Sequence, residues 1–98
     1  MISCKFFNSK DQYLNFSGKG VCLAMNLPKS NKSSKFLLGV ESLAVKYKCL
    51  ININKDSHVS LSVVKKIFKK NYDTFKREIK LVDSDRILTS EMSKKLRI

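Results

Sequence analysis

The residues best suited to binding chemistry are the cations between positions 60 and 80. The stretch SLSVVKKIFKKNYDTFKREI carries seven lysine and arginine residues between Lys65 and Lys80, and an apolar residue returns every three or four positions. Lysine holds a phosphate as a point charge, whereas arginine can bind guanine through two parallel hydrogen bonds. The pattern fits one of two structures. The first is one long basic helix, which would be a plain charged surface, and the second is two short helices that could read DNA.

The single-helix interpretation is a helix from about residue 60 to residue 82. No glycine or proline interrupts this stretch, and lysine and arginine are tolerated on the outer face of a helix. Asn71 falls in the apolar seam, where the spacing asks for an apolar group. Such a helix could pack on a sheet or pair with a second copy. Its seam would contain Leu61, Val64, Phe68, Phe75, Ile79 and Val82.

The two-helix interpretation is a helix-turn-helix, with a turn of three residues, KKN, that ends at Asn71 as N-cap. The first helix would be anchored by Val64 and Phe68, and the second by Phe75 and Ile79. In a helix-turn-helix the outward side chains of the second helix contact base edges. We expect base contacts from Tyr72, Asp73, Lys76 and Arg77. We expect phosphate contacts, which position the protein without reading sequence, from Lys65, Lys66, Lys69, Lys70 and Lys80.

This stretch resembles the first helix-turn-helix of AraC-family transcription regulators. The matching positions are Ser60, Leu61, Val63, Val64, Phe68, Asn71, Thr74, Phe75, Arg77 and Ile79. The segment DRILTSEMSKKLRI is similar to the linker helix of virulence-type members through Ile87, Leu88, Met92, Lys94 and Leu96. The resemblance implies a DNA-binding regulator, or a truncated member that antagonises a full-length one. The chain departs from the family at Lys65, where a small residue is usual, and in having one motif instead of two.

The net charge limits the classes of partner that the protein attracts. Twenty basic against eight acidic residues give +12 at pH 7, a field that concentrates polyanions near the protein. We expect double-stranded DNA as the partner, with a homodimer or a heteromeric regulator partner supplying a second reading helix. The alternative is a phage- or plasmid-type inhibitor that binds an acidic host protein through the basic helix and a strand edge.

Other functional classes receive less support from the residues. Cys4, Cys22 and Cys49 are scattered without metal-ligand spacing, and His58 is the only histidine. We therefore expect neither a metal nor another cofactor, and we do not expect an enzyme, although His58 could serve a small nuclease. There is no apolar run of about 20 residues and no signal peptide at the N-terminus, so we expect a cytoplasmic protein that does not bind membranes.

The elements that must position these residues indicate a single α+β domain over residues 1–98. We expect a small antiparallel β meander in a mainly β half (1–57), followed by a basic helical half (58–98). The expected strands are ISCKFF, DQYLNFS and VCLAMNL, with a turn at GKG (18–20), a loop at 28–35 and a strand, in preference to a helix, at 43–54. We expect Ser57 or Ser60 to cap the first basic helix. Asp83 or Ser84 would cap a last helix that includes Ile87, Leu88, Met92 and Leu96.

Overall fold

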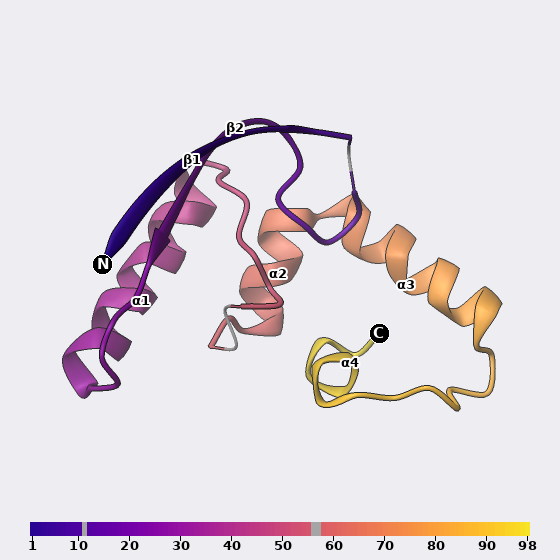
Figure 1. Ribbon diagram of the computed structural model, residues 1–98. Helices are drawn as coiled ribbons and strands as arrows, with labels where there is room; N and C mark the ends of the chain where they lie inside the picture. Colours follow the sequence, from indigo (N-terminus) through magenta and orange to yellow (C-terminus); the bar gives the residue numbers. More distant parts are fainter. Residues whose placement is uncertain (11, 56–57) are drawn as a thin grey trace.

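A computed structural model describes residues 1–10, 12–55 and 58–98. An antiparallel pair of strands is followed by helices, so the predicted α+β class is confirmed. Figure 1 shows the hairpin and the first helix on one side of the molecule and the other helices on the other side. The elements are β1 (Ile2–Ser9), β2 (Gly18–Met25), α1 (Asn31–Lys46), α2 (Leu61–Phe68), α3 (Lys70–Val82) and α4 (Glu91–Leu96).

The hairpin confirms two of the expected strands and corrects the third. β1 contains ISCKFF, and β2 contains most of VCLAMNL, with Ile2 opposite Met25 and Phe6 opposite Val21. The expected strand DQYLNFS is wrong, because the structure describes residues 12–17 as a loop. Polar side chains hold this loop: the Gln12 amide donates to Ser17 Oγ at 3.1 Å. The turn expected at residues 18–20 is also wrong, since these residues begin β2.

Helix α1 replaces two elements that the sequence pattern suggested. Both the loop expected at 28–35 and the strand expected at 43–54 are wrong, because α1 occupies Asn31–Lys46. The serines that resemble loop residues start the helix, since Ser30 Oγ accepts from the Ser33 amide at 3.1 Å. Lys48 then adopts φ 57°, and the Cys49 amide donates to the Ala44 carbonyl at 2.9 Å, which ends the helix.

The basic stretch forms two helices, as the helix-turn-helix interpretation requires. Ser60 caps α2 as expected, with its Oγ accepting from the Val63 amide at 3.3 Å, while Ser57 lies outside the described residues. The turn differs from the prediction. Lys69 is the single residue between α2 and α3, with φ 45° and ψ −120°. Asn71 is therefore inside α3, and its predicted role as N-cap is wrong.

The C-terminal helix is shorter than predicted. Ser90 caps α4, and Ser90 and Ser93 accept from each other's backbone amides at 3.0 and 2.8 Å. The expected caps Asp83 and Ser84 are wrong, although the Asp83 carboxylate does accept from the amides of Ile87 and Leu88, each at 2.9 Å. These two bonds hold Ile87 and Leu88 in a loop, so both lie outside the helix predicted for them.

The buried core lies in the second half of the chain. It is one cluster to which α2, α3, α4 and the segments around them contribute, and Leu14 packs against it from the loop after β1. Ala44 of α1 is buried outside this cluster, and no described residue of β1 or β2 is buried. The side chains of the cluster are Ile53, Val59, Val64, Phe68, Tyr72, Leu96 and Ile98.

The molecule is extended for its size. Its accessible surface is 7927 Å², whereas a compact monomer of 11.2 kDa exposes about 5700 Å². Its radius of gyration is 14.6 Å, against about 12.6 Å for a compact domain of this length. The dimensions of 41 × 32 × 22 Å agree with this. The chain therefore leaves a large area uncovered.

Candidate interaction surfaces

The first candidate is the basic surface, which we define as the exposed cations of α2, α3 and the residue between them. The apolar face of α2 turns inward, with Val64 fully buried and Phe68 nearly so. This orientation leaves the lysines of α2 outside, and the exposed face of α3 adds further cations beside Asp73. The members of the basic surface are Lys65, Lys66, Lys69, Lys70, Lys76, Arg77 and Lys80.

The structure places every predicted phosphate-contacting lysine at the surface, together with Asp73, Lys76 and Arg77. The exception among the predicted contacts is Tyr72, which is only 2% exposed. Its predicted role in contacting bases is wrong, because the side chain points into the core. The reason is its position within α3: Tyr72 precedes Phe75 by three residues and Ile79 by seven, so it lies on the apolar face of that helix.

Tyr72 joins α3 to the C-terminal segment. Its hydroxyl donates to the Leu96 carbonyl at 2.6 Å, a bond between residues that are both buried. Lys65 Nζ lies 5.4 Å from the centre of the ring, within the range of a cation–π interaction. The sequence does contain the signal that identifies Tyr72, since the spacing 68, 72, 75, 79 is that of one helix face.

The surroundings of Tyr72 also affect its titration. Burial raises the pKa of the phenol above its ordinary value of 10.0, because the charged phenolate would lose its hydration. The negative charge of Asp73 raises the pKa further, and the positive charge of Arg97 lowers it. Arg97 is a residue that the sequence reasoning missed: it follows α4 and lies close enough to act on the same side chain.

The charges of the basic surface are not neutralised within the described part of the chain. None of its cations forms an ion pair with a described carboxylate, although Asp73 and Glu78 lie on the same helix; the ion pair that the structure records is Lys94 with Glu91, at 3.0 Å. Arg77 makes one long hydrogen bond, 3.4 Å, to Thr74 Oγ1. The guanidinium and ammonium groups are therefore available to a polyanion.

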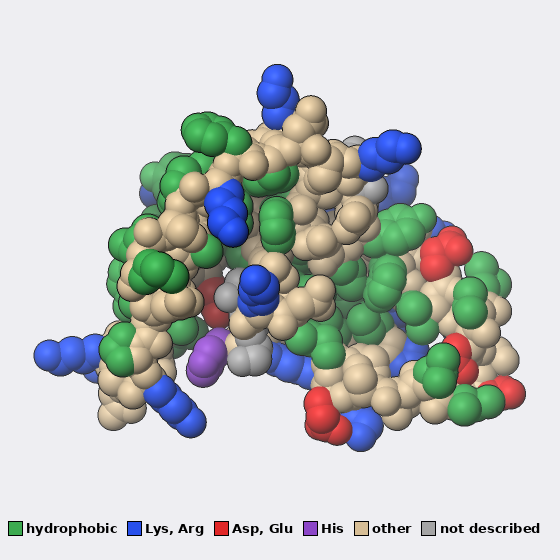
Figure 2. All heavy atoms as spheres, viewed as in Figure 1, with side chains coloured by type: hydrophobic (Ala, Val, Ile, Leu, Met, Phe, Trp, Pro, Cys, Tyr) green, Lys and Arg blue, Asp and Glu red, His purple; other side chains and the backbone are tan. Residues whose placement is uncertain are grey.

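The second candidate is the apolar face of the hairpin. In an antiparallel pair, residues directly opposite each other share a face and successive residues alternate. The register therefore gathers apolar side chains on one face, and four of them are more than half exposed: Ile2 at 73%, Phe6 at 87%, Val21 at 52% and Leu23 at 66%. Figure 2 shows hydrophobic side chains gathered at the surface over this part of the molecule. The face contains Ile2, Cys4, Phe6, Val21, Leu23 and Met25, and we call it the hairpin face.

The opposite face of the hairpin is better covered. Phe7 is half-buried there, and its ring meets the edge of the Phe16 ring at a centroid distance of 5.3 Å. The ring also lies over Gly20 on the neighbouring strand, where a Cβ atom would approach it to 3.3 Å. The loop between the strands thus packs beneath one face of the hairpin, while the hairpin face stays open to solvent.

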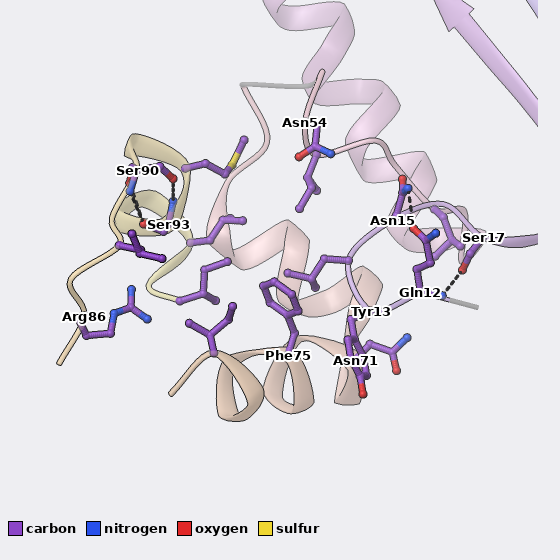
Figure 3. A pocket seen from close by; sticks show the side chains of 18 residues that line it. Gln12, Tyr13, Asn15, Ser17, Asn54, Asn71, Phe75, Arg86, Ser90 and Ser93 are labelled. Atoms are coloured by element: carbon purple, nitrogen blue, oxygen red, sulfur yellow. Dashed lines mark hydrogen bonds between the residues drawn. The ribbon is translucent and has the colours of Figure 1, made fainter. Parts of the chain in front are cut away.

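The third candidate is a hollow of about 1100 Å³ beside α3 and α4. Figure 3 shows Phe75 directed into it from α3, with Arg86 at one end and Gln12 and Asn15 at the other. Apart from Arg86, its described lining carries no charged side chain and no histidine, so the wall is made of apolar and neutral polar side chains. Its apolar lining consists of Tyr13, Leu14, Leu50, Ile53, Phe75, Ile79, Leu88, Met92, Leu96 and Ile98.

Residues with other functional potential do not assemble into a site. Within the described ranges, no group of three His, Cys, Asp or Glu side chains could hold a metal ion. His58 is exposed, and Asp56 beside it lies outside the described residues. Among the helices described, each is too short or too polar to cross a lipid bilayer.

Comparisons of the chain with protein-family models, with curated proteins and with solved structures produced no match. A functional proposal for this chain therefore rests on the surfaces described above.

Proposed function

We propose that this chain is a protein-binding module whose partner covers the hairpin face. The observation that carries the proposal is the accessible surface of 7927 Å², roughly 2200 Å² above the value of about 5700 Å² expected of a compact monomer. A standard interface buries about 800 Å² on each partner, and permanent complexes bury about 1000 to 2500 Å² on each. The excess matches an interface of the permanent kind.

The location of the exposed apolar side chains supports the hairpin as the contact. Phe6 is 87% exposed, and a phenylalanine presents roughly 150–250 Å² of surface, most of it apolar. Three further apolar side chains of the same face are more than half exposed, so the hairpin face is an exposed apolar patch of the kind that often marks an interaction site. A two-stranded hairpin is also only marginally stable in water by itself. Covering this face would stabilise the hairpin as well as the complex.

The charge of the chain indicates the kind of partner. With a net charge of +12, the chain attracts an acidic protein over distances of about a Debye length and repels a basic one. The two lysines of the hairpin, Lys5 and Lys19, are exposed, and the strands contain no acidic residue. We therefore propose an acidic protein with an apolar contact surface as the partner.

Site-specific photocross-linking tests this proposal. A benzoylphenylalanine at position 6 places a cross-linker on the hairpin face, and one at position 81 provides the control, because Leu81 is nearly as exposed, at 79%, but belongs to α3 and lines none of the candidate surfaces. We expect one dominant acidic protein adduct from position 6, which does not form from position 81 and which binds the purified chain. The same adducts from both positions, or none from position 6, would contradict the proposal.

A second candidate function is the binding of duplex DNA, favoured by the un-neutralised basic surface. Asp73, Lys76 and Arg77 lie exposed on α3, and arginine and aspartate can contact guanine and cytosine edges respectively. The resemblance to the AraC family supports the same interpretation. One reading helix gives limited affinity, so a second copy or a larger regulator would be needed to supply another.

Selection from random duplex DNA at about 50 and 200 mM salt tests this second candidate. If α3 reads bases, one enriched motif survives the higher salt, and Arg77→Ala relaxes the preference at one position. Lys70→Ala should instead weaken binding evenly and reduce the salt slope by about one phosphate. Binding without a motif that disappears at the higher salt would contradict base reading.

A further inference from the structure

The edge of β1 suggests how the partner of the hairpin is held. We infer that the partner adds an extended strand, with alternating apolar and acidic residues, antiparallel to the outer edge of β1. This inference rests on the proposed protein-binding function and specifies its geometry. Strand addition of this kind uses backbone hydrogen bonds for affinity and alternate side chains for specificity.

The hydrogen bonds of the hairpin determine which backbone groups are free. The Asn26 amide donates to the Met1 carbonyl at 3.0 Å, and these residues continue the register of the strands, in which Ile2 faces Met25. In an antiparallel ladder, hydrogen-bonded pairs alternate with pairs that direct their amides outward. The residues of β1 whose amide and carbonyl groups point away from β2 are therefore Ile2, Cys4, Phe6 and Asn8.

These four residues are also exposed, which distinguishes the β1 edge from the β2 edge. In β2 the outward groups belong to Lys19, Val21, Leu23 and Met25, and Met25 is half-buried. β2 also begins with Gly18 at φ 90° and has a second glycine at position 20, which weakens an edge as a template for pairing. β1 has no glycine and no proline, and Lys5 is its single charged residue.

The hairpin face and the β1 edge together determine the pattern of the partner strand. A residue that forms a hydrogen-bonded pair with Cys4 or Phe6 directs its side chain to the same face as they do, which is the hairpin face. The partner residues whose amides face β1 must therefore be apolar. The alternate residues lie on the opposite face beside Lys5, where a carboxylate is favourable.

A second copy of this chain fits the edge less well than an acidic partner. A symmetric antiparallel pairing of two β1 edges centred at Lys5 would place two lysine side chains opposite each other, which is destabilising. Each copy also carries a net charge of +12. Charge complementarity thus favours a different protein with acidic residues in its extended segment.

Capped peptides of alternating valine and glutamate test the inference, with backbone amide shifts of the full chain as the readout. Two matched variants have the same sequence, charge and number of methyl groups: one is N-methylated on the valine amides and the other on the glutamate amides. We expect the unmethylated peptide to bind with shifts centred on Ile2, Cys4, Phe6 and Asn8. Methylation on valine should weaken binding at least tenfold, whereas methylation on glutamate should leave it unchanged. Lys5→Glu should weaken binding of the same peptide and strengthen that of its valine–lysine counterpart.

Several outcomes would overturn the inference. Equal binding of the two methylated peptides would show attraction by charge alone, and shifts centred on Val21 and Leu23 would assign the strand to the β2 edge. Self-association of the chain through β1 would replace the acidic partner with a second copy. Absence of binding at about 2 mM unmethylated peptide, an affinity below about 4 kcal/mol, would exclude strand addition. In each case an adduct from position 6 still supports the protein-binding function, so failure of the geometry and failure of the function are separable.

Discussion

The two halves of the chain use apolar residues in opposite ways. In residues 51–98 most of them converge on one buried cluster around Val64 and Leu96, although Leu81, Val82, Ile87 and Leu88 stay exposed, whereas in residues 1–50 only Ala44 is buried among those described. The first half is nevertheless rich in large apolar side chains that remain exposed in β1, β2, α1 and the residue that follows α1. These include Ile2, Phe6, Val21, Leu23, Phe36, Leu38, Leu43 and Tyr47.

The difference lies in the layers available to each half, since both contain regular elements with apolar faces. A sheet or a helix is stable only when another layer buries its apolar face. In the second half α2, α3 and α4 lie on the same side of the molecule (Figure 1), and all three contribute side chains to one buried cluster. Among the described residues, no such layer covers the hairpin face. This contrast supports the proposal that a partner covers the first half, and the following experiments test it.

The largest expected effect comes from a matched pair of phenylalanine substitutions. Phe68→Ala should lower the free energy of unfolding by about 4 kcal/mol, because Phe68 is 5% exposed and its loss leaves a cavity. Phe6→Ala should change it by less than about 0.5 kcal/mol, because Phe6 is 87% exposed. Urea denaturation followed by circular dichroism measures both values. A comparable loss for Phe6→Ala would mean that the hairpin face is already covered in the isolated chain.

A smaller effect is expected at the bond that closes the second half. Tyr72→Phe removes the hydroxyl that donates to the Leu96 carbonyl, which should cost about 1 to 1.5 kcal/mol. Tyr47→Phe is the control, since Tyr47 is 65% exposed and its hydroxyl makes no described hydrogen bond. Equal stability of the two variants in urea denaturation would contradict the role of the Tyr72 bond.

The same residue predicts a dependence on alkaline pH. The folded-state pKa of Tyr72 is raised above 10.0, so the unfolded chain loses this proton first. The stabilisation that Tyr72 provides is therefore complete below about pH 10 and is lost as the pH rises through the folded-state pKa. The free energy of unfolding, measured between pH 9 and 11, should fall more steeply with pH in the native chain than in Tyr72→Phe. Parallel curves would show that the phenol titrates as if exposed.

The smallest effect is expected at the break between α2 and α3, where the sign of the change in stability, rather than its size, is the test. Lys69 has φ 45° and ψ −120°, which costs a residue with a side chain about 1 kcal/mol or more and glycine little. Lys69→Gly should therefore stabilise the protein by about 1 kcal/mol, whereas Lys66→Gly inside α2 should destabilise it by about as much. Thermal unfolding distinguishes them. Destabilisation by both would indicate one continuous helix.

Local signals in the sequence predicted part of this fold. The short apolar stretches ISCKFF and VCLAMNL, bounded by asparagine and glycine, identify the hairpin, and Ser60 identifies the start of α2. The basic stretch was correctly expected to have exposed cations on α2 and α3. These features depend on patterns within a few residues and do not require contacts between distant parts of the chain.

The errors arose where a local signal has two structural uses. The serines at 30–34 resemble a loop, but a serine side chain can also cap a helix, and the same residues begin α1. Tyr72 is a second case, because a tyrosine can serve as an exposed contact residue or as a core residue with a hydrogen-bonded hydroxyl, and its spacing from Phe75 and Ile79 puts it on the buried face of α3. The open hairpin face could not be predicted, because exposure depends on the absence of a covering layer rather than on the strand sequence.

Hydrogen exchange of the isolated chain, followed residue by residue, compares the stability of the two halves. We predict that the amides of Val64, Phe68 and Tyr72 exchange only through global unfolding, whereas the paired amides of Lys5 and Cys22 exchange at least about 100-fold faster. Equal protection in the hairpin and in the helical core would contradict the account, because the first half would then be stable without a partner.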